Sequence, residues 1–205
     1  MTDLTTGHRT VALDTCVWIY HLKAHPEYVD LTAGLLTSVA AGECRAIGSE
    51  LTSLELLVRP LQMHREDVAD EYEALLTHFP HLALAPVSRD VLLKAAAIRA
   101  EYGLRTPDAI IVATGILRGA TRLITNDRAW KRVMDIEVVC LTDYLVIYED
   151  SALTVPLEIQ FTSMRAEFQA GAIGVVPIPA SFYLLASVLA GIGMAMAQRE
   201  PRPGP

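Results

Sequence analysis

The sequence predicts an α/β fold with three layers, in which helices cover both faces of a central, parallel, doubly wound sheet. Short apolar runs alternate with helical patterns along the first 145 residues, as in successive strand–helix–strand units. The runs are apolar on both sides, which is expected of parallel strands buried on both faces. No internal repeat or low-complexity tract interrupts the pattern before about residue 150.

The individual elements follow from local patterns taken in chain order. Each short apolar run is predicted to be a strand, at residues 10–14, 44–49, 82–87, 122–125 and 137–141. Helical spacing between the first three strands predicts a short helix through Trp18 and Tyr20, followed by helices at 28–42, 50–58 and 66–79.

Capping residues locate the remaining helix ends. We expect Pro60 to stop or kink the third of these helices, because proline lacks the amide donor that a helix interior needs. Ser88 is expected to cap the next helix, whose apolar face carries Val91, Ala95, Ile98 and Tyr102. Thr106 is predicted to be the N-cap of the following helix and Pro107 its first residue, which is a strong start signal.

The alternation of strands and helices is lost after about residue 150. We therefore divide the chain into a domain at 1–148, a linker at 149–175 and an apolar tail at 176–205. Residues 180–197 are eighteen consecutive uncharged, mostly apolar residues, at the lower edge of the length that spans a bilayer. An apolar C-terminal helix is predicted there.

Composition excludes several classes of protein. The formal net charge of −7 argues against binding nucleic acid through bulk electrostatics. The three cysteines are far apart and form no CxxC pair, so neither a disulfide framework nor a zinc site is indicated and a reducing cytoplasm fits best. The N-terminus has no basic segment followed by an apolar one, so a secretory signal is not indicated.

Four carboxylates are the candidate functional residues. Taken singly, Asp14 and Asp108 fit helix starts, Asp127 fits a turn and Glu55 fits a solvated helix position. Together they suggest a site, since Asp14 ends the first strand and Asp127 the fourth, and ligands of doubly wound sheets bind where such neighbouring strands end.

Four converging carboxylates would repel one another unless a cation neutralised them. Oxygen ligands without histidine or cysteine favour Mg²⁺ or Mn²⁺, and all six histidines lie at or before His81. The sequence therefore predicts a site for Mg²⁺ or Mn²⁺ built from Asp14, Glu55, Asp108 and Asp127.

Three segments resemble the successive motifs of PIN-domain nucleases, especially VapC-type toxins of toxin–antitoxin pairs. They are "VALDTCVWIYHL", "LTSLELLVRPL" and "TPDAIIVATGILRGATRLITND", and the resemblance covers roughly residues 9–145. The family's acidic quartet falls on the same four carboxylates, with Thr15 and Asn126 beside it. Many relatives carry another acid where this chain has Ala129, which leaves the number of metal ions, one or two, open.

The resemblance implies a PIN-like fold and a metal-dependent endoribonuclease that hydrolyses RNA phosphodiester bonds as the toxin of a type II pair. Its implied partners are RNA, a cognate antitoxin protein and a second copy of the chain in a homodimer. We assign substrate positioning to Thr15, Asn126 and Arg128. Basic residues near Asp127 could grip RNA phosphates or simply form a solvated face: Arg118, Arg122, Arg128, Lys131 and Arg132.

The tail resembles a PEP-CTERM sorting signal in "VPIPASFYLLASVLAGIGMAMAQREPRP", residues 176–203. Membrane association through residues 176–199, a helix packed on the domain and a fusion without a role remain alternatives. Other interpretations of the whole chain are a non-catalytic PIN-like RNA-binding or interaction module and a membrane- or surface-sorted protein. A haloacid dehalogenase-type phosphohydrolase would need an aspartate where Cys16 stands.

Overall fold

A five-stranded parallel sheet forms the centre of the fold in the computed structural model, which describes residues 4, 5 and 7–149. The strands are β1 (Thr10–Leu13), β2 (Arg45–Ser49), β3 (Leu82–Ala85), β4 (Arg122–Thr125) and β5 (Glu137–Cys140). Their order in the sheet is β3-β2-β1-β4-β5, and every neighbouring pair is parallel. The predicted strands and parallel sheet are confirmed. Strand order reverses between β1 and β4, which are neighbours as expected.

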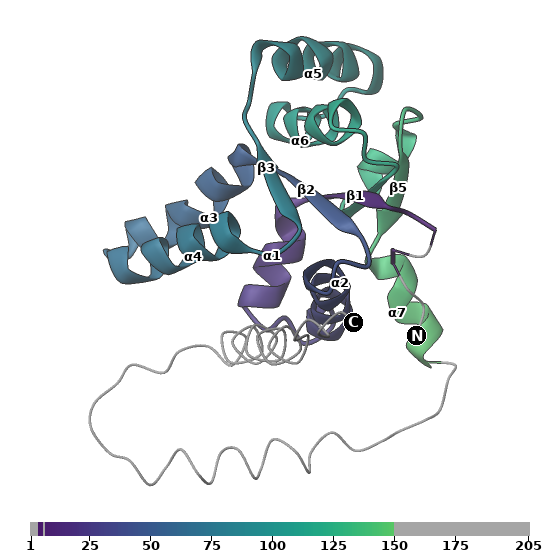
Figure 1. The fold of residues 1–205 in the computed structure, drawn as a ribbon. Coiled ribbons are helices and arrows are strands. Elements are labelled where there is room, and N and C mark those ends of the chain that lie inside the picture. The colour runs from purple at the N-terminus through teal and green to yellow at the C-terminus, as the bar shows by residue number, and fades with distance from the viewer. Residues whose placement is uncertain (1–3, 6, 150–205) are drawn as a thin grey trace, which may run out of the picture.

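Helices cover both faces of this sheet, so the three-layer α/β prediction is confirmed. Figure 1 shows α5 and α6 on one side of the strands, α1 and α2 on the other, and the α3–α4 pair projecting sideways. The helices are α1 (Thr15–Leu22), α2 (Val29–Ala40), α3 (Glu50–Gln62), α4 (Glu66–His78), α5 (Arg89–Tyr102), α6 (Thr106–Leu117), the 3₁₀ helix η1 (Arg128–Arg132) and α7 (Thr142–Glu149).

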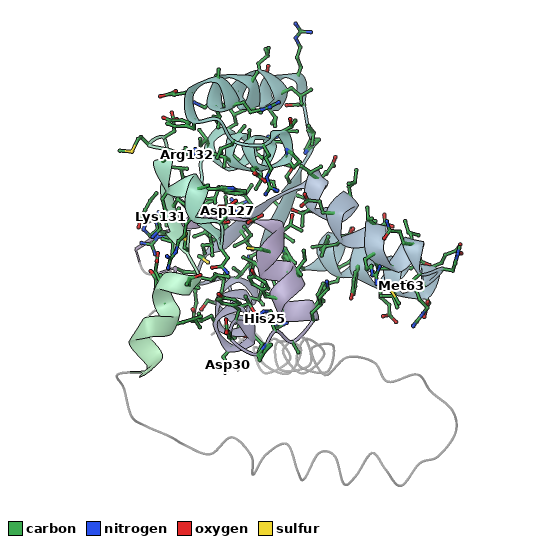
Figure 2. The ribbon with its side chains drawn as sticks, turned by 180° about the vertical axis from the view of Figure 1, so that it is seen from behind. His25, Asp30, Met63, Asp127, Lys131 and Arg132 are labelled. Carbon is green, nitrogen blue, oxygen red and sulfur yellow. The ribbon has the colours of Figure 1, made fainter. Side chains whose placement is uncertain are left out.

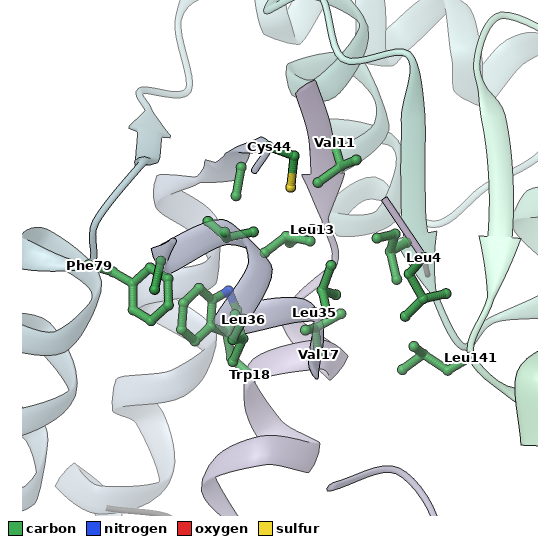
Figure 3. Packing of buried hydrophobic residues seen from close by; sticks show 14 of the residues in the cluster. Leu4, Val11, Leu13, Val17, Trp18, Leu35, Leu36, Cys44, Phe79 and Leu141 are labelled. Atoms are coloured by element: carbon green, nitrogen blue, oxygen red, sulfur yellow. The ribbon is translucent and has the colours of Figure 1, made fainter. Parts of the chain in front are cut away.

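Two apolar cores lie on the two faces of the sheet, and β1 contributes to both. Val11 and Leu13 pack with α1 and α2, as Figure 3 shows, whereas Ala12 packs with α5 and α6. This is the two-residue period of a strand covered on both sides. Trp18 of α1 meets Phe79 edge to face, with ring centroids 5.1 Å apart, which joins α1 to the segment between α4 and β3.

Two predicted helix boundaries are wrong. Pro60 does not stop α3, because proline removes a single amide donor and the next turn still closes: the Met63 N–H donates to the Arg59 carbonyl at 3.2 Å and to the Pro60 carbonyl at 3.0 Å. The N-cap of α6 is Arg105 rather than Thr106, since Ala109 donates to the Arg105 carbonyl at 3.0 Å. The Thr106 hydroxyl instead accepts from the guanidinium of Arg99 at 2.7 Å.

The predicted start of α5 is confirmed, because the Ser88 hydroxyl accepts from the Val91 amide. The predicted C-terminal tail with its apolar helix and sorting signal lies outside the described residues, as does the linker from residue 150 onward. Within the part of the chain that the structure describes, no helix is long and apolar enough to cross a bilayer.

Because His21 of α1 is buried, we expect the folded protein to lose stability in acid. Its side chain is buried, and among the described residues neither ring nitrogen has a hydrogen-bond partner. Burial therefore lowers the pKa of the imidazole below its ordinary 6.5. Below that pH the unfolded chain binds a proton that the folded chain does not, so the free energy of unfolding falls as the pH drops, by at most about 1.4 kcal/mol per pH unit.

Urea unfolding between pH 8 and pH 5, followed by tryptophan fluorescence, measures this effect. His21→Leu should flatten the pH dependence by about one proton, because leucine is apolar and does not titrate. Equal slopes for the two proteins would show that His21 is not the group responsible.

Candidate functional site

Asp14 lies at the reversal point of the sheet, where β1 ends beside β4. Its amide donates to the Ile124 carbonyl at 3.0 Å, which extends the β1–β4 pairing by one residue. Although Asp14 is the N-cap of α1, its side chain makes no capping hydrogen bond. The carboxylate instead accepts from the Thr125 hydroxyl at 2.6 Å. The Asp14 carboxylate therefore does not serve as the cap of α1, and the helix-cap interpretation does not account for its position.

The Asp14 carboxylate is unusually costly to ionise. The residue is only 9% exposed, and this burial raises the pKa of its carboxyl group, with the nearby charge of Glu55 acting in the same direction. Hydrogen bonds from Thr125 and Cys16 lower the pKa only in part. A cation close to Asp14 would relieve this penalty.

Glu55 reaches the same edge of the sheet from α3. Its carboxylate accepts a hydrogen bond from the hydroxyl of Thr15, which is the first residue of α1. The Thr15 hydroxyl also lies 3.2 Å from the hydroxyl of Thr52, which precedes Glu55 by one turn of α3. Glu55 is half-buried rather than fully solvated, so the two threonines fix its carboxylate beside Asp14.

Asp108 and Asp127 face a common partner, Arg105. The Arg105 guanidinium donates to Asp108 Oδ2 at 2.9 Å, and another of its nitrogens lies 3.9 Å from Asp127 Oδ2. The other oxygen of Asp127 accepts from the Ala129 amide at 2.8 Å and caps η1. Asp127 therefore both caps this short helix and faces the site.

Asn126 connects three elements around this edge. Its side-chain amide donates to the Tyr20 hydroxyl at 3.1 Å, and its carbonyl oxygen accepts from the Thr142 amide at 3.0 Å. These contacts tie the end of β4 to α1 and to the start of α7. Asn126 thus holds the loop that carries Asp127.

The predicted metal ligands have the right chemistry and an incomplete geometry. All four are carboxylates, the donors that Mg²⁺ and Mn²⁺ prefer. Among the described residues, however, no three acidic, histidine or cysteine side chains lie close enough together to hold a metal ion. The four carboxylates share one edge of the sheet without forming a closed ligand cluster, and the Arg105 guanidinium lies against two of them.

The predicted basic segment is divided between structural and exposed residues. Arg122 is not free for a substrate, because it donates to the Leu4 carbonyl and to Glu137. Lys131 pairs with Asp143. Arg128 and Arg132 are exposed on η1, and Figure 2 shows Lys131 and Arg132 near Asp127 on this side of the molecule.

Two residues of the candidate site, Thr125 and Arg105, were not predicted from the sequence. Thr125 holds the Asp14 carboxylate, and its hydroxyl also accepts from the Asp127 amide at 3.0 Å. Arg105 precedes Asp108 by three residues, a spacing that favours an ion pair at a helix start. That spacing was the available signal for Arg105, whereas Thr125 carried none beyond its place at a strand end.

Comparisons with known proteins find a family for the part of the chain that carries the four candidate carboxylates. The PIN domain family matches residues 11–136, which is more than half of the chain. The fold is similar to that of VapBC2 from Rickettsia felis bound to a DNA fragment from its promoter, at 18% identity and a TM-score of 0.51, covering 64% of this chain and 98% of that chain.

Two further solved structures are similar. DNA-bound VapBC from Salmonella typhimurium aligns at 22% identity with a TM-score of 0.51, covering 64% of this chain and 98% of that one. A toxin–antitoxin complex from Klebsiella pneumoniae aligns at 23% identity with a TM-score of 0.49, covering 64% and 97%. At such identities the likeness to the two structures with a TM-score of 0.51 shows a shared fold. No curated protein matches the sequence.

Proposed function

The chain belongs to the PIN-domain family, and from this premise we propose that it is a metal-dependent endoribonuclease and the toxin of a type II toxin–antitoxin pair. PIN domains are typically nucleases that use divalent metals. The observation that carries the proposal is the position of Asp14, Glu55, Asp108 and Asp127 at one edge of the sheet, where strand order reverses. Ligands of doubly wound sheets bind at such a point.

We propose that these four carboxylates hold Mg²⁺ or Mn²⁺. When bound, such a cation activates a water molecule and neutralises charge on the phosphate under attack. The neighbouring hydroxyls keep the carboxylates in place: Thr125 holds Asp14, and Thr15 holds Glu55. The buried, repelled charge of Asp14 supports this assignment, because a cation would remove the cost of ionising it.

We propose that RNA lies along η1. Arg128 and Arg132 are exposed there and follow Asp127 directly in the chain. Their guanidinium groups suit phosphate oxygens, which would offset the unfavourable net charge of −7 at short range. In this proposal Arg128 contacts the substrate, while Thr15 and Asn126 position it indirectly through Glu55 and the Asp127 loop.

An exposed apolar face on α3 supports a protein partner, which we propose to be the cognate antitoxin. Leu54, Val58 and Leu61 are all exposed, and their spacing puts them on one side of the helix. Exposed apolar groups of this kind commonly mark interaction surfaces. The same face is open to a second copy of the chain, so the molar mass of the protein with and without the antitoxin separates the two occupants.

Metal-dependent RNA cleavage by the purified chain tests the proposed function. We expect cleavage with Mg²⁺ or Mn²⁺ and none with excess EDTA, because all four proposed ligands are hard oxygen donors. Restoring Mn²⁺ after EDTA treatment should restore cleavage, which controls for inactivation. Undiminished cleavage in EDTA would exclude the metal mechanism. RNA binding without cleavage under either metal would favour the non-catalytic module.

A further inference from the structure

Arg105 is the one basic side chain that contacts the candidate site directly within the described residues. It pairs with Asp108 at 2.9 Å and with Asp127 at 3.9 Å. These two acids come from different elements, the first turn of α6 and the start of η1. Arg105 thus bridges two proposed metal ligands that are nineteen positions apart in the sequence.

The fold does not need this side chain to start α6. Arg105 serves as the N-cap through its backbone, and its side chain makes no capping hydrogen bond. Pro107 in the first turn already favours the helix start. The conformation of the Arg105 side chain is therefore set mainly by the two aspartates that it contacts.

The Arg105 side chain is also exposed enough to move away from the two aspartates. Its side chain is 78% exposed, whereas that of Asp108 is 13% exposed. An exposed cation loses little hydration in an ion pair and gains little from it, so such pairs break readily. A divalent cation carries twice the charge and binds the same carboxylate oxygens, so it cannot share them with the guanidinium without strong repulsion.

We propose that Arg105 is a built-in counter-ion that competes with the divalent cation for the carboxylates of Asp108 and Asp127. In the metal-free protein it balances two of the crowded acids and keeps the ligand cluster from closing. Metal binding displaces it into solvent. This inference rests on the proposed function, since it concerns the metal affinity of the same site.

Titration of the metal-free chain with MnCl₂ by isothermal calorimetry tests the competition without depending on catalysis. Arg105→Gln should bind Mn²⁺ roughly three- to tenfold more tightly than the parent, the range that corresponds to one or two exposed ion pairs. The melting temperature without metal should fall, because the two aspartates lose their counter-ion, and the rise on adding Mn²⁺ should be larger.

Arg132→Gln is the matched control. It removes the same charge from an exposed residue that follows Asp127 closely in the chain, but in the described part of the chain Asp108 and Asp127 form their ion pairs with Arg105 and not with Arg132. Its Mn²⁺ affinity should stay within about twofold of the parent, as expected for an exposed charge screened by salt. Circular dichroism checks that both variants keep the fold.

The outcomes separate the inference from the function on which it rests. Equal Mn²⁺ affinity in the parent and in Arg105→Gln would overturn the competition while leaving metal binding intact. An equal gain in Arg132→Gln would also overturn it, since the effect would then be one of net charge. Absence of Mn²⁺ binding in all three proteins would overturn the proposed function and the inference together.

Discussion

Asp14→Asn is expected to abolish RNA cleavage by the purified chain and to relieve the growth arrest that we expect on expression. The amide keeps the shape of the side chain but loses the charge that holds a cation. Metal-ion catalysis contributes several kcal/mol of transition-state stabilisation. Because each 1.36 kcal/mol corresponds to a tenfold change in rate, the cleavage rate should fall by about a hundredfold or more.

The same substitution should make the metal-free protein more stable. Asp14 is buried and repelled by Glu55, so the pKa of its carboxyl group in the folded state is raised above the unfolded value of 3.8. Such a group stabilises the fold only while it is protonated, and this stabilisation is lost as the pH rises through the folded pKa. Asparagine can still accept the hydrogen bond from Thr125 and never becomes charged.

Thermal melts in EDTA across a range of pH measure this gain. The melting temperatures of Asp14→Asn and the parent should agree near pH 3.8 and separate as the pH rises. Asp108→Asn is the matched control, because it makes the same chemical change but removes an ion pair with Arg105, so its melting temperature should not rise. A less stable Asp14→Asn protein at neutral pH would contradict the assignment of Asp14 as a strained, buried charge.

Gly115→Ala is expected to lower the free energy of unfolding by about 1–3 kcal/mol, the usual cost of overpacking a core. Gly115 lies on α6 where the helix crosses β1, and an added Cβ would come within 2.7 Å of the Ala12 Cβ. Both atoms are held close to the backbone, so neither can rotate away. The helix propensity of alanine, worth about 1 kcal/mol over glycine, does not offset this clash.

Two further variants identify the cause of this loss. Gly34→Ala in α2 is the matched control: nothing lies within 4 Å of its added Cβ, so it should stabilise the protein by up to about 1 kcal/mol. Combining Gly115→Ala with Ala12→Gly removes the clashing methyl group, so the double variant should lose less than the sum of the two single losses, as measured by urea unfolding. Strict additivity would show that the close approach of α6 to β1 is not what Gly115 provides.

The strands and most helices could be predicted from the sequence because their signals are local. The apolar run that forms β4 and the capping hydroxyl of Ser88 act over a few residues, and each led to the observed element. The same locality explains the errors. Proline at position 60 was expected to stop or kink α3, yet the helix continues to Gln62, because the proline removes only one amide donor.

The candidate site was predictable in part for a similar reason. Asp14 and Asp127 end adjacent parallel strands, so strand order alone brings them to one edge of the sheet. The contacts of the individual acids depend on side chains far away in the sequence. Arg122 illustrates the limit, because its proximity to Asp127 in the chain suggested a phosphate contact, whereas its guanidinium is bound to Leu4 and Glu137.

The sequence by itself determined the α/β architecture, the resemblance to PIN domains and the identity of four acids, because periodicity, strand ends and motif spacing are properties of the chain. Only the tertiary structure decided which side chains contact those acids. Asp14 accepts a hydrogen bond from Thr125 and Glu55 accepts one from Thr15, whereas Asp108 and Asp127 form ion pairs with Arg105. The physical reason is that a carboxylate's environment depends on distances of a few ångströms between segments that are far apart in the sequence, and no local pattern encodes those distances.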